Sequence, residues 1–119
     1  MLERNGVDGR AIQKAIETRD GHALSEFYAE NAVLTIIDKH NPPSRPRELT
    51  GKAEISEFWN DVCSREMKHK VDATVTEGDR ISLTETCAYP DGTRVFCAAM
   101  IDVSDGSIVR QTMIQAWDE

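Results

Sequence analysis

The second half of the chain constrains the fold most, because short stretches of alternating apolar and polar residues are separated there by turn signals. Two of these signals, Tyr89-Pro90-Asp91-Gly92 and Asp105-Gly106, combine residues that fix or permit the backbone angles of a tight turn. Glu77-Gly78-Asp79 marks a third turn. We therefore predict an antiparallel sheet built from hairpins, with strands at residues 67–77, 80–89, 94–103 and 107–117.

In the first half of the chain, apolar residues recur at the spacing of a helix instead. Asp8 is predicted to cap a first helix and Thr50 a third, and Asp20-Gly21 separates the first helix from a short second one. The apolar faces of these helices consist of Ala11, Ile12, Ala15 and Ile16, then Ala23, Leu24, Phe27 and Tyr28, then Ile55, Phe58, Trp59, Val62 and Cys63. Residues 32–37 predict a strand, and residues 39–50 predict a polar loop kept irregular by Pro42, Pro43 and Pro46.

Helices segregated from a hairpin-built sheet indicate an α+β fold. The length of 119 residues fits a single domain over residues 1–119. The net charge of −7 repels phosphate backbones and anionic headgroups, so neither nucleic acid nor a membrane is an expected partner. The start shows no signal peptide and no apolar run reaches membrane-spanning length, so we expect a cytoplasmic protein.

The cysteines Cys63, Cys87 and Cys97 are odd in number and sit among apolar residues. This favours reduced, buried thiols over a disulfide framework. Their spacing matches no common zinc pattern, and the chain has no Gly-rich phosphate loop. We therefore expect neither a metal nor a cofactor.

Three local sequences, taken in their order and spacing, resemble one family. They are Phe27-Tyr28-Ala29-Glu30-Asn31-Ala32-Val33-Leu34, residues 49–55 followed by Phe58-Trp59, and Asp105-Gly106-Ser107-Ile108-Val109. Over about residues 8–118 the chain resembles the nuclear transport factor 2-like superfamily, in particular its SnoaL-like polyketide-cyclase and ketosteroid-isomerase branches. The resemblance implies a cone-shaped, cystatin-like fold, in which a curved antiparallel or mixed sheet packs on about three N-terminal helices and encloses a pocket.

The resemblance also implies a homodimer formed through the outer face of the sheet. The strand at residues 94–103 fits this expectation, because apolar residues occupy both of its faces: Val95, Cys97, Ala99 and Ile101 on one, Phe96, Ala98 and Met100 on the other. Such a strand is covered on both sides. A second copy of the chain is the expected cover.

His69 and Glu85 are the candidate catalytic residues. His69 shares strand parity with apolar Val71, Ala73 and Val75, so a neutral imidazole there could act as a base or donate to a ligand. The alternative is a half-exposed histidine at a strand end. The turn at Glu77-Gly78-Asp79 leaves open whether His69 and Glu85 share a face.

Glu85 shares parity with Ile81, Leu83 and Cys87. A carboxylate on that face would need a partner and could serve as a general acid or base. Pairing across the turn at Gly92 would place it near Cys97 or Ala99, two small residues suited to line a pocket. The alternatives are a salt bridge at the rim, or a face that points outward.

Tyr28, Trp59 and Asp38 complete the predicted ligand-binding set with Cys97 and Ala99. The Tyr28 hydroxyl and the Trp59 indole N–H could meet a ligand, although both side chains could equally be core. Asp38 could reach inward from the end of its strand or simply cap that end. Arg45 and Arg47 could meet an anionic ligand from the proline-rich loop, or could be solvated.

The chain departs from the isomerase branch where that branch carries its catalytic tyrosine and two acids. Those positions fall on Ala15, Ile36 and Ala99, so ketosteroid-isomerase chemistry is not expected. A SnoaL-like cyclase needs an acid or base in its pocket, for which His69 and Glu85 are available. Our first hypothesis is a pocket protein that binds a small, mostly apolar molecule, with cofactor-free acid/base catalysis if it is an enzyme. The second is a non-catalytic dimerisation or ligand-sensing module.

Overall fold

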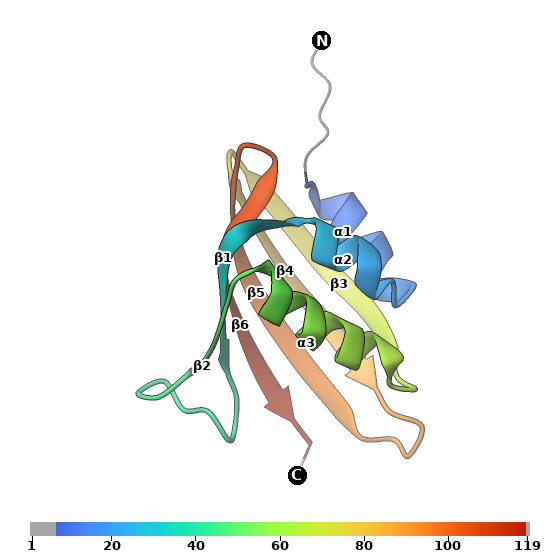
Figure 1. The fold of residues 1–119 in the computed structure, drawn as a ribbon. Coiled ribbons are helices and arrows are strands. Elements are labelled where there is room, and N and C mark those ends of the chain that lie inside the picture. Colours follow the sequence, from blue (N-terminus) through green and yellow to red (C-terminus); the bar gives the residue numbers. More distant parts are fainter. Residues whose placement is uncertain (1–6, 119) are drawn as a thin grey trace.

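The computed structural model describes residues 7–118, and these form three helices and six strands. The elements are α1 (Gly9–Glu17), α2 (Gly21–Glu26), β1 (Tyr28–Ile37), β2 (Arg47–Thr50), α3 (Lys52–Ser64), β3 (Lys68–Glu77), β4 (Arg80–Ala88), β5 (Arg94–Ser104) and β6 (Ser107–Trp117) (Figure 1). The strands make one sheet in the order β2-β1-β6-β5-β4-β3. Only β1 and β6 pair in parallel, so the sheet is mixed and the predicted α+β class is confirmed.

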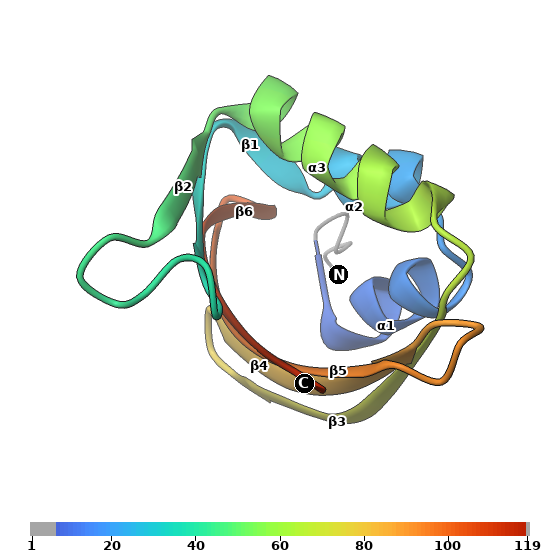
Figure 2. The same ribbon diagram turned by 90° about the horizontal axis from the view of Figure 1, so that it is seen from below.

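The sheet curls around the helices, as the view along its axis shows (Figure 2). The helices lie on the concave side, where α1 packs against β3 and α3 packs against β1 and α2. The largest fully buried side chains come from both layers and are Leu34, Ile36, Ile55, Ile101 and Ile108. None of the described helices is long and apolar enough to cross a membrane.

Two of the three described helices begin at an aspartate whose side chain caps the first turn, Asp8 for α1 and Asp20 for α2. Asp8 accepts a hydrogen bond from the Ala11 N–H at 2.8 Å, which confirms the predicted cap of α1. The predicted cap Thr50 is wrong: Thr50 is paired with Val33 as the last residue of β2, and Gly51 caps α3 instead. A φ of 94° at that position suits glycine, because side chains rarely adopt it.

Two boundaries in the first half differ from the prediction. The second helix ends at Glu26, and β1 begins at Tyr28 rather than at residue 32, because Tyr28 already pairs with Ile108 of β6. The predicted irregular loop at residues 39–50 contains β2, which pairs with residues 33–36 of β1. All three prolines precede β2, so the prediction extended their effect too far along the chain.

One extra residue in β3 corrects the predicted parity of that strand. Val71 pairs with Glu85 and Ala73 pairs with Thr84, so Asp72 is unmatched and forms a β-bulge. His69 and Val71 face the inside of the sheet. Beyond the bulge the inward-facing residues are Thr74 and Thr76, which lie beside Gly9 of α1. Ala73 and Val75 are therefore exposed, contrary to the prediction.

Glu17, at the end of α1, holds the bulge in place. Its Oε2 accepts a hydrogen bond from the Val71 N–H at 2.8 Å, so a side chain supplies the acceptor for this backbone group. We expect Glu17→Ala to lower the free energy of unfolding by about 1.5 kcal/mol, the low end of the range for hydrogen bonds to charged groups, because Glu17 is exposed. Glu17→Gln should cost less, because its amide oxygen can still accept. Urea denaturation measures both, and equal losses would contradict the role of the acceptor.

Candidate functional site

A cavity of about 150 Å³ opens at the end of the curled sheet where β1, β4 and β6 finish. We call it the mouth cavity. Its lining comes from α3, from all six strands and from the adjoining turns, and consists of Ile36, Asp38, Arg47, Phe58, Trp59, Val62, Arg65, Met67, His69, Glu85, Cys87, Tyr89, Val95, Cys97, Met113, Gln115 and Trp117. Most of the lining residues are apolar, and the side chains of Asp38, Arg47, Arg65, His69, Glu85 and Gln115 add polar groups among them. Such a mixture is usual for a small-molecule site.

A second, much smaller space of about 10 Å³ lies deeper, between α1, α2 and the sheet. Trp59, Glu85, Cys97 and Met113 line both spaces and so form the partition between them. The deeper space has room for about one water molecule. The mouth cavity is therefore the part of the interior that can receive a ligand.

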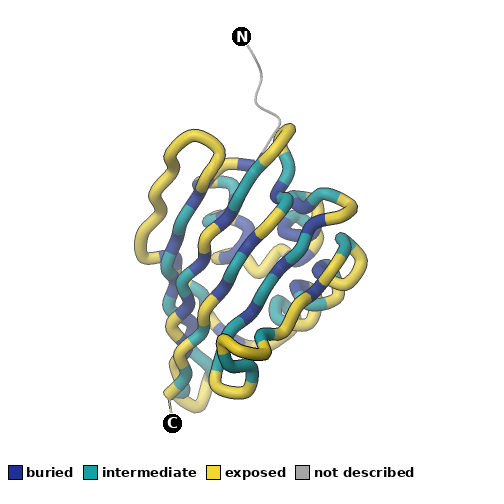
Figure 3. The backbone as a smooth tube through the Cα atoms, turned by 90° about the vertical axis from the view of Figure 1, so that its left-hand side faces the viewer, coloured by how far each residue is buried: buried dark blue, intermediate teal, exposed yellow. Residues whose placement is uncertain are grey.

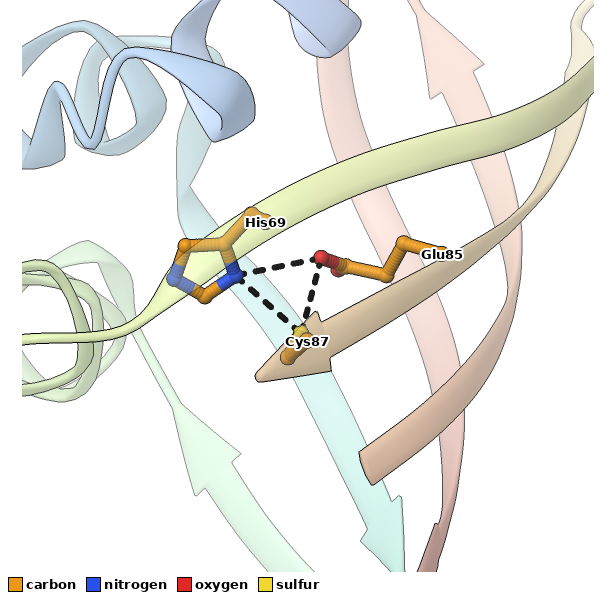
Figure 4. A group of neighbouring side chains, drawn as sticks. All are labelled: His69, Glu85 and Cys87. Carbon is orange, nitrogen blue, oxygen red and sulfur yellow. Dashed lines mark hydrogen bonds and ion pairs between the residues drawn. The ribbon is translucent and has the colours of Figure 1, made fainter. Parts of the chain in front are cut away.

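A compact polar cluster lies on the inner wall of the mouth cavity and consists of His69, Glu85 and Cys87 (Figure 4). His69 Nδ1 lies 3.3 Å from Glu85 Oε1 and 3.1 Å from Cys87 Sγ. The Cys87 S–H donates to the same Glu85 oxygen at 3.2 Å. The side chains of His69 and Glu85 are only 5% and 6% exposed, so the cluster is shielded from bulk water.

Strand pairing brings these three residues together. In the pairing of β3 with β4, His69 lies opposite Cys87 and Val71 opposite Glu85. Odd-numbered residues of β4 all face inward, as the sequence predicted for Glu85. Glu85 also lies opposite Cys97 of β5, one of its two predicted neighbours. The shared face of His69 and Glu85, which the sequence left open, is thus fixed by the register.

The contacts within the cluster decide its protonation. Burial lowers the pKa of the His69 imidazole, but its contacts with Cys87 and Glu85 outweigh burial and raise this pKa to about 9. His69 is therefore protonated at neutral pH, unlike the neutral imidazole considered from the sequence. The neighbouring Cys97 thiol and burial hold the pKa of Cys87 well above its ordinary value, so Cys87 stays a thiol and is a poor nucleophile.

His69 uses only one of its two ring nitrogens. Both contacts are made by Nδ1, whereas Nε2 is buried and has no hydrogen-bond partner among the described residues. A buried polar atom without a partner is unusual in a native structure. The cluster also brings an imidazole nitrogen, a carboxylate oxygen and a sulfur within 4.8 Å of one another, which makes these three residues the candidate metal ligands of the described chain.

Tyr28 and Trp59 lie side by side in the interior. The Trp59 Nε1–H donates to the Tyr28 hydroxyl at 3.1 Å, and that hydroxyl donates to Gln111 Oε1 of β6. All three side chains are buried, and burial raises the pKa of Tyr28. Tyr28 lines only the deeper space, whereas Trp59 also lines the mouth cavity. The sequence prediction missed Gln111, although it alternates in step with the inward-facing Met113.

The other predicted binding residues divide between the two spaces. Asp38 lines the mouth cavity, but its Oδ1 accepts from the N–H groups of His40 and Asn41 and from the Asn41 amide, so it also holds the turn after β1. Cys97 lines both spaces, and Ala99 lines only the deeper one. Ala15, Ile36 and Ala99, which the sequence resemblance placed at the catalytic positions of the isomerase branch, are all buried and apolar.

Polar and aromatic residues at the rim were missed by the sequence prediction. Arg65 donates to the Tyr89 hydroxyl at 3.0 Å and to Asp61 at 2.6 Å. The Tyr89 ring stacks on Trp117 with 5.9 Å between centroids. Arg47, for which the sequence left open contact with an anionic ligand or solvation, lies over the Phe58 ring. No spacing pattern links these residues along the chain, because they converge from α3, β2, β6 and the turn after β4.

A curled α+β sheet with helices in its concave face and a cavity at one end defines the cone-shaped, cystatin-like class of proteins. Comparison with known proteins is more specific: the family model described as SnoaL-like domain matches residues 10–111. This chain belongs to that family, within the nuclear transport factor 2-like superfamily. No protein with a curated description matches the sequence.

Solved structures agree on the fold. A nuclear transport factor 2-like protein of unknown function from Mesorhizobium loti is 22% identical, covers 89% of this chain and 85% of its own, and has a TM-score of 0.76. A ketosteroid isomerase candidate from Kribbella flavida is 19% identical, with coverage of 92% and 74% and a TM-score of 0.72. A de novo designed protein with a curved β-sheet, 10% identical, covers 88% and 81% with a TM-score of 0.68. These similarities establish the fold, which by itself does not define a reaction.

Proposed function

We propose that this protein binds a small, mostly apolar organic molecule in the mouth cavity and acts on it as a cofactor-free acid/base catalyst. The buried contact between His69 and Glu85 at the cavity wall is the observation that carries the proposal. Trp59 and Phe58 offer apolar surface to the ligand, and the proton-transfer pair lies beside it. A reaction of this kind includes isomerisation, cyclisation, dehydration and hydrolysis.

Proton transfer can be tested without knowing the natural substrate. In deuterium oxide, small cyclic ketones that bind in the cavity should exchange the acidic C–H protons next to their carbonyl group faster with the protein than without it, as followed by proton NMR. We expect His69→Ala and Glu85→Gln each to lower the exchange rate by about 100-fold or more, which is the usual contribution of a general acid or base. Arg45→Ala is the matched control, because Arg45 is not part of the cavity lining.

Ligand binding is measured separately by thermal shift with the same compounds. A compound that binds but exchanges equally fast with wild type and both variants would remove the catalytic roles of His69 and Glu85. The protein would then be a ligand-binding module, as in the second hypothesis. Failure of every compound to raise the melting temperature would overturn the small-molecule pocket itself.

We also propose a homodimer formed through the convex face of the sheet. Phe96, Met100 and Ile114 are 48%, 57% and 50% exposed and lie on neighbouring strands of this face, where buried and exposed residues alternate (Figure 3). Analytical ultracentrifugation should give twice the mass of the chain for wild type and the single mass for Met100→Glu. Val75→Glu on the edge strand is the control and should stay dimeric, whereas a monomeric wild type would contradict the proposal.

A further inference from the structure

We propose that His69, Glu85 and Cys87 form a binding site for a thiophilic divalent cation, with Zn²⁺ as the expected ion. The proposal goes beyond the function suggested above and does not depend on it, because it concerns metal affinity and not catalysis. It also departs from the sequence analysis, which predicted no metal because the cysteine spacing matched no zinc motif. The three ligands come from two paired strands, so no short motif could reveal them.

The geometry of the cluster fits the ion. The three candidate ligand atoms lie 3.1, 3.2 and 3.3 Å apart in a triangle. In a tetrahedral zinc site with ordinary Zn–N, Zn–O and Zn–S bonds, such atoms lie about 3.3–3.6 Å apart. An outward movement of a few tenths of an ångström would therefore open the triangle enough for the ion to bind all three.

The charge of the cluster fits as well. A neutral imidazole, a carboxylate and a thiolate together carry two negative charges, which one Zn²⁺ neutralises. A neutral assembly is favoured in a site where the His69 and Glu85 side chains are almost completely buried. Binding of the ion would release the two protons that His69 and Cys87 carry in the metal-free cluster. The cluster therefore holds either the ion or these two protons. The sulfur ligand selects zinc or cobalt over Mg²⁺ and Ca²⁺, which prefer oxygen.

The surroundings give this site an open coordination position. All three ligands line the mouth cavity, and the described residues provide no fourth ligand within the cluster. Three protein ligands with a vacant position are typical of zinc sites that accept water or a substrate. An ion there would present its free position to a molecule in the cavity, and His69 and Glu85 could no longer exchange protons with that molecule.

The test uses the untagged full chain and Co²⁺ as a spectroscopic substitute for Zn²⁺. Wild type should bind one Co²⁺ per chain with a near-ultraviolet thiolate-to-cobalt charge-transfer band, and Zn²⁺ should displace it, whereas Mg²⁺ should not. Cys87→Ser should abolish the band, and His69→Gln and Glu85→Gln should each weaken binding at least about tenfold, since even partners outside the ligand set change affinity by that amount.

Cys63→Ser is the matched control, because Cys63 is a half-buried thiol of α3 outside the cluster. This variant should retain the band and full affinity. Circular dichroism and thermal unfolding confirm that each variant is folded. Absence of the band in folded wild type, or its loss in Cys63→Ser with retention in Cys87→Ser, would overturn the proposal. Either result leaves the deuterium-exchange and thermal-shift tests of the proposed function unaffected, so the two can fail separately.

Discussion

Replacing Trp59 with alanine is expected to lower the free energy of unfolding by about 3–5 kcal/mol, the usual cost of removing a buried aromatic side chain. Trp59 is 5% exposed and packs edge-on against Phe58 at 5.1 Å between ring centroids. It also forms part of the partition between the two interior spaces. Alanine would therefore leave a void that joins them, and Tyr28 would lose the hydrogen bond from the indole N–H.

Trp59→Phe separates these contributions. It retains most of the ring volume and loses only the hydrogen bond, so we expect a loss of about 1–2 kcal/mol. Urea denaturation followed by circular dichroism measures both variants. Free indole should raise the melting temperature of Trp59→Ala more than that of wild type, because only the variant has the vacated volume. Equal losses for the two variants would show that Trp59 is not a packing element of the core.

Deletion of Lys70 is expected to cost at least about 3 kcal/mol, because it forces a charged residue onto the inner face of β3. Side chains alternate between the two faces of a sheet. Removing one residue therefore turns every side chain before or after the deletion to the opposite face. If His69 keeps its place, Asp72 takes the position of Val71 opposite Glu85, where two carboxylates would be buried together. If Val71 keeps its place, His69 turns outward and Lys68 turns inward.

Deletion of Asp72 is the matched comparison and should be far better tolerated. Asp72 is the unpaired residue of the bulge, so its removal leaves Val71 inward, Ala73 outward and Thr74 inward in a regular strand. The losses are the local bend and the hydrogen bond from Thr86 to Asp72. Chemical denaturation of both deletions decides the point: similar stabilities would mean that the register of β3 does not depend on the inward position of Val71.

Residues close together in the sequence determined much of this fold. The alternation of β4 placed Glu85 inward with Ile81, Leu83 and Cys87. The turn at Gly92 predicted Cys97 or Ala99 as its neighbour on β5, and Cys97 is the observed partner. Asp8 accepts the hydrogen bond expected of a cap. These features are predictable because each depends on strand period, turn chemistry or a helix end, all of which act over a few residues.

Other features depend on partners distant in the sequence, and there the prediction was incomplete. Tyr28 belongs to β1 and not to a helix because β6 pairs with it, and β2 forms because β1 offers it a free edge. The bulge at Asp72 changes the parity of β3 without any Gly or Pro to mark it. Gln111 and Trp59 share Tyr28 as a hydrogen-bond partner, which no sequence spacing indicates.

The sequence by itself determined the α+β class, the inner face of β4 and the presence of His69 and Glu85 as isolated polar residues among apolar ones. Only the tertiary structure decided that these two residues meet, that Cys87 joins them, and that they line a cavity. The physical reason is that alternation fixes a face within one strand, whereas register, bulges and helix packing fix which faces oppose one another.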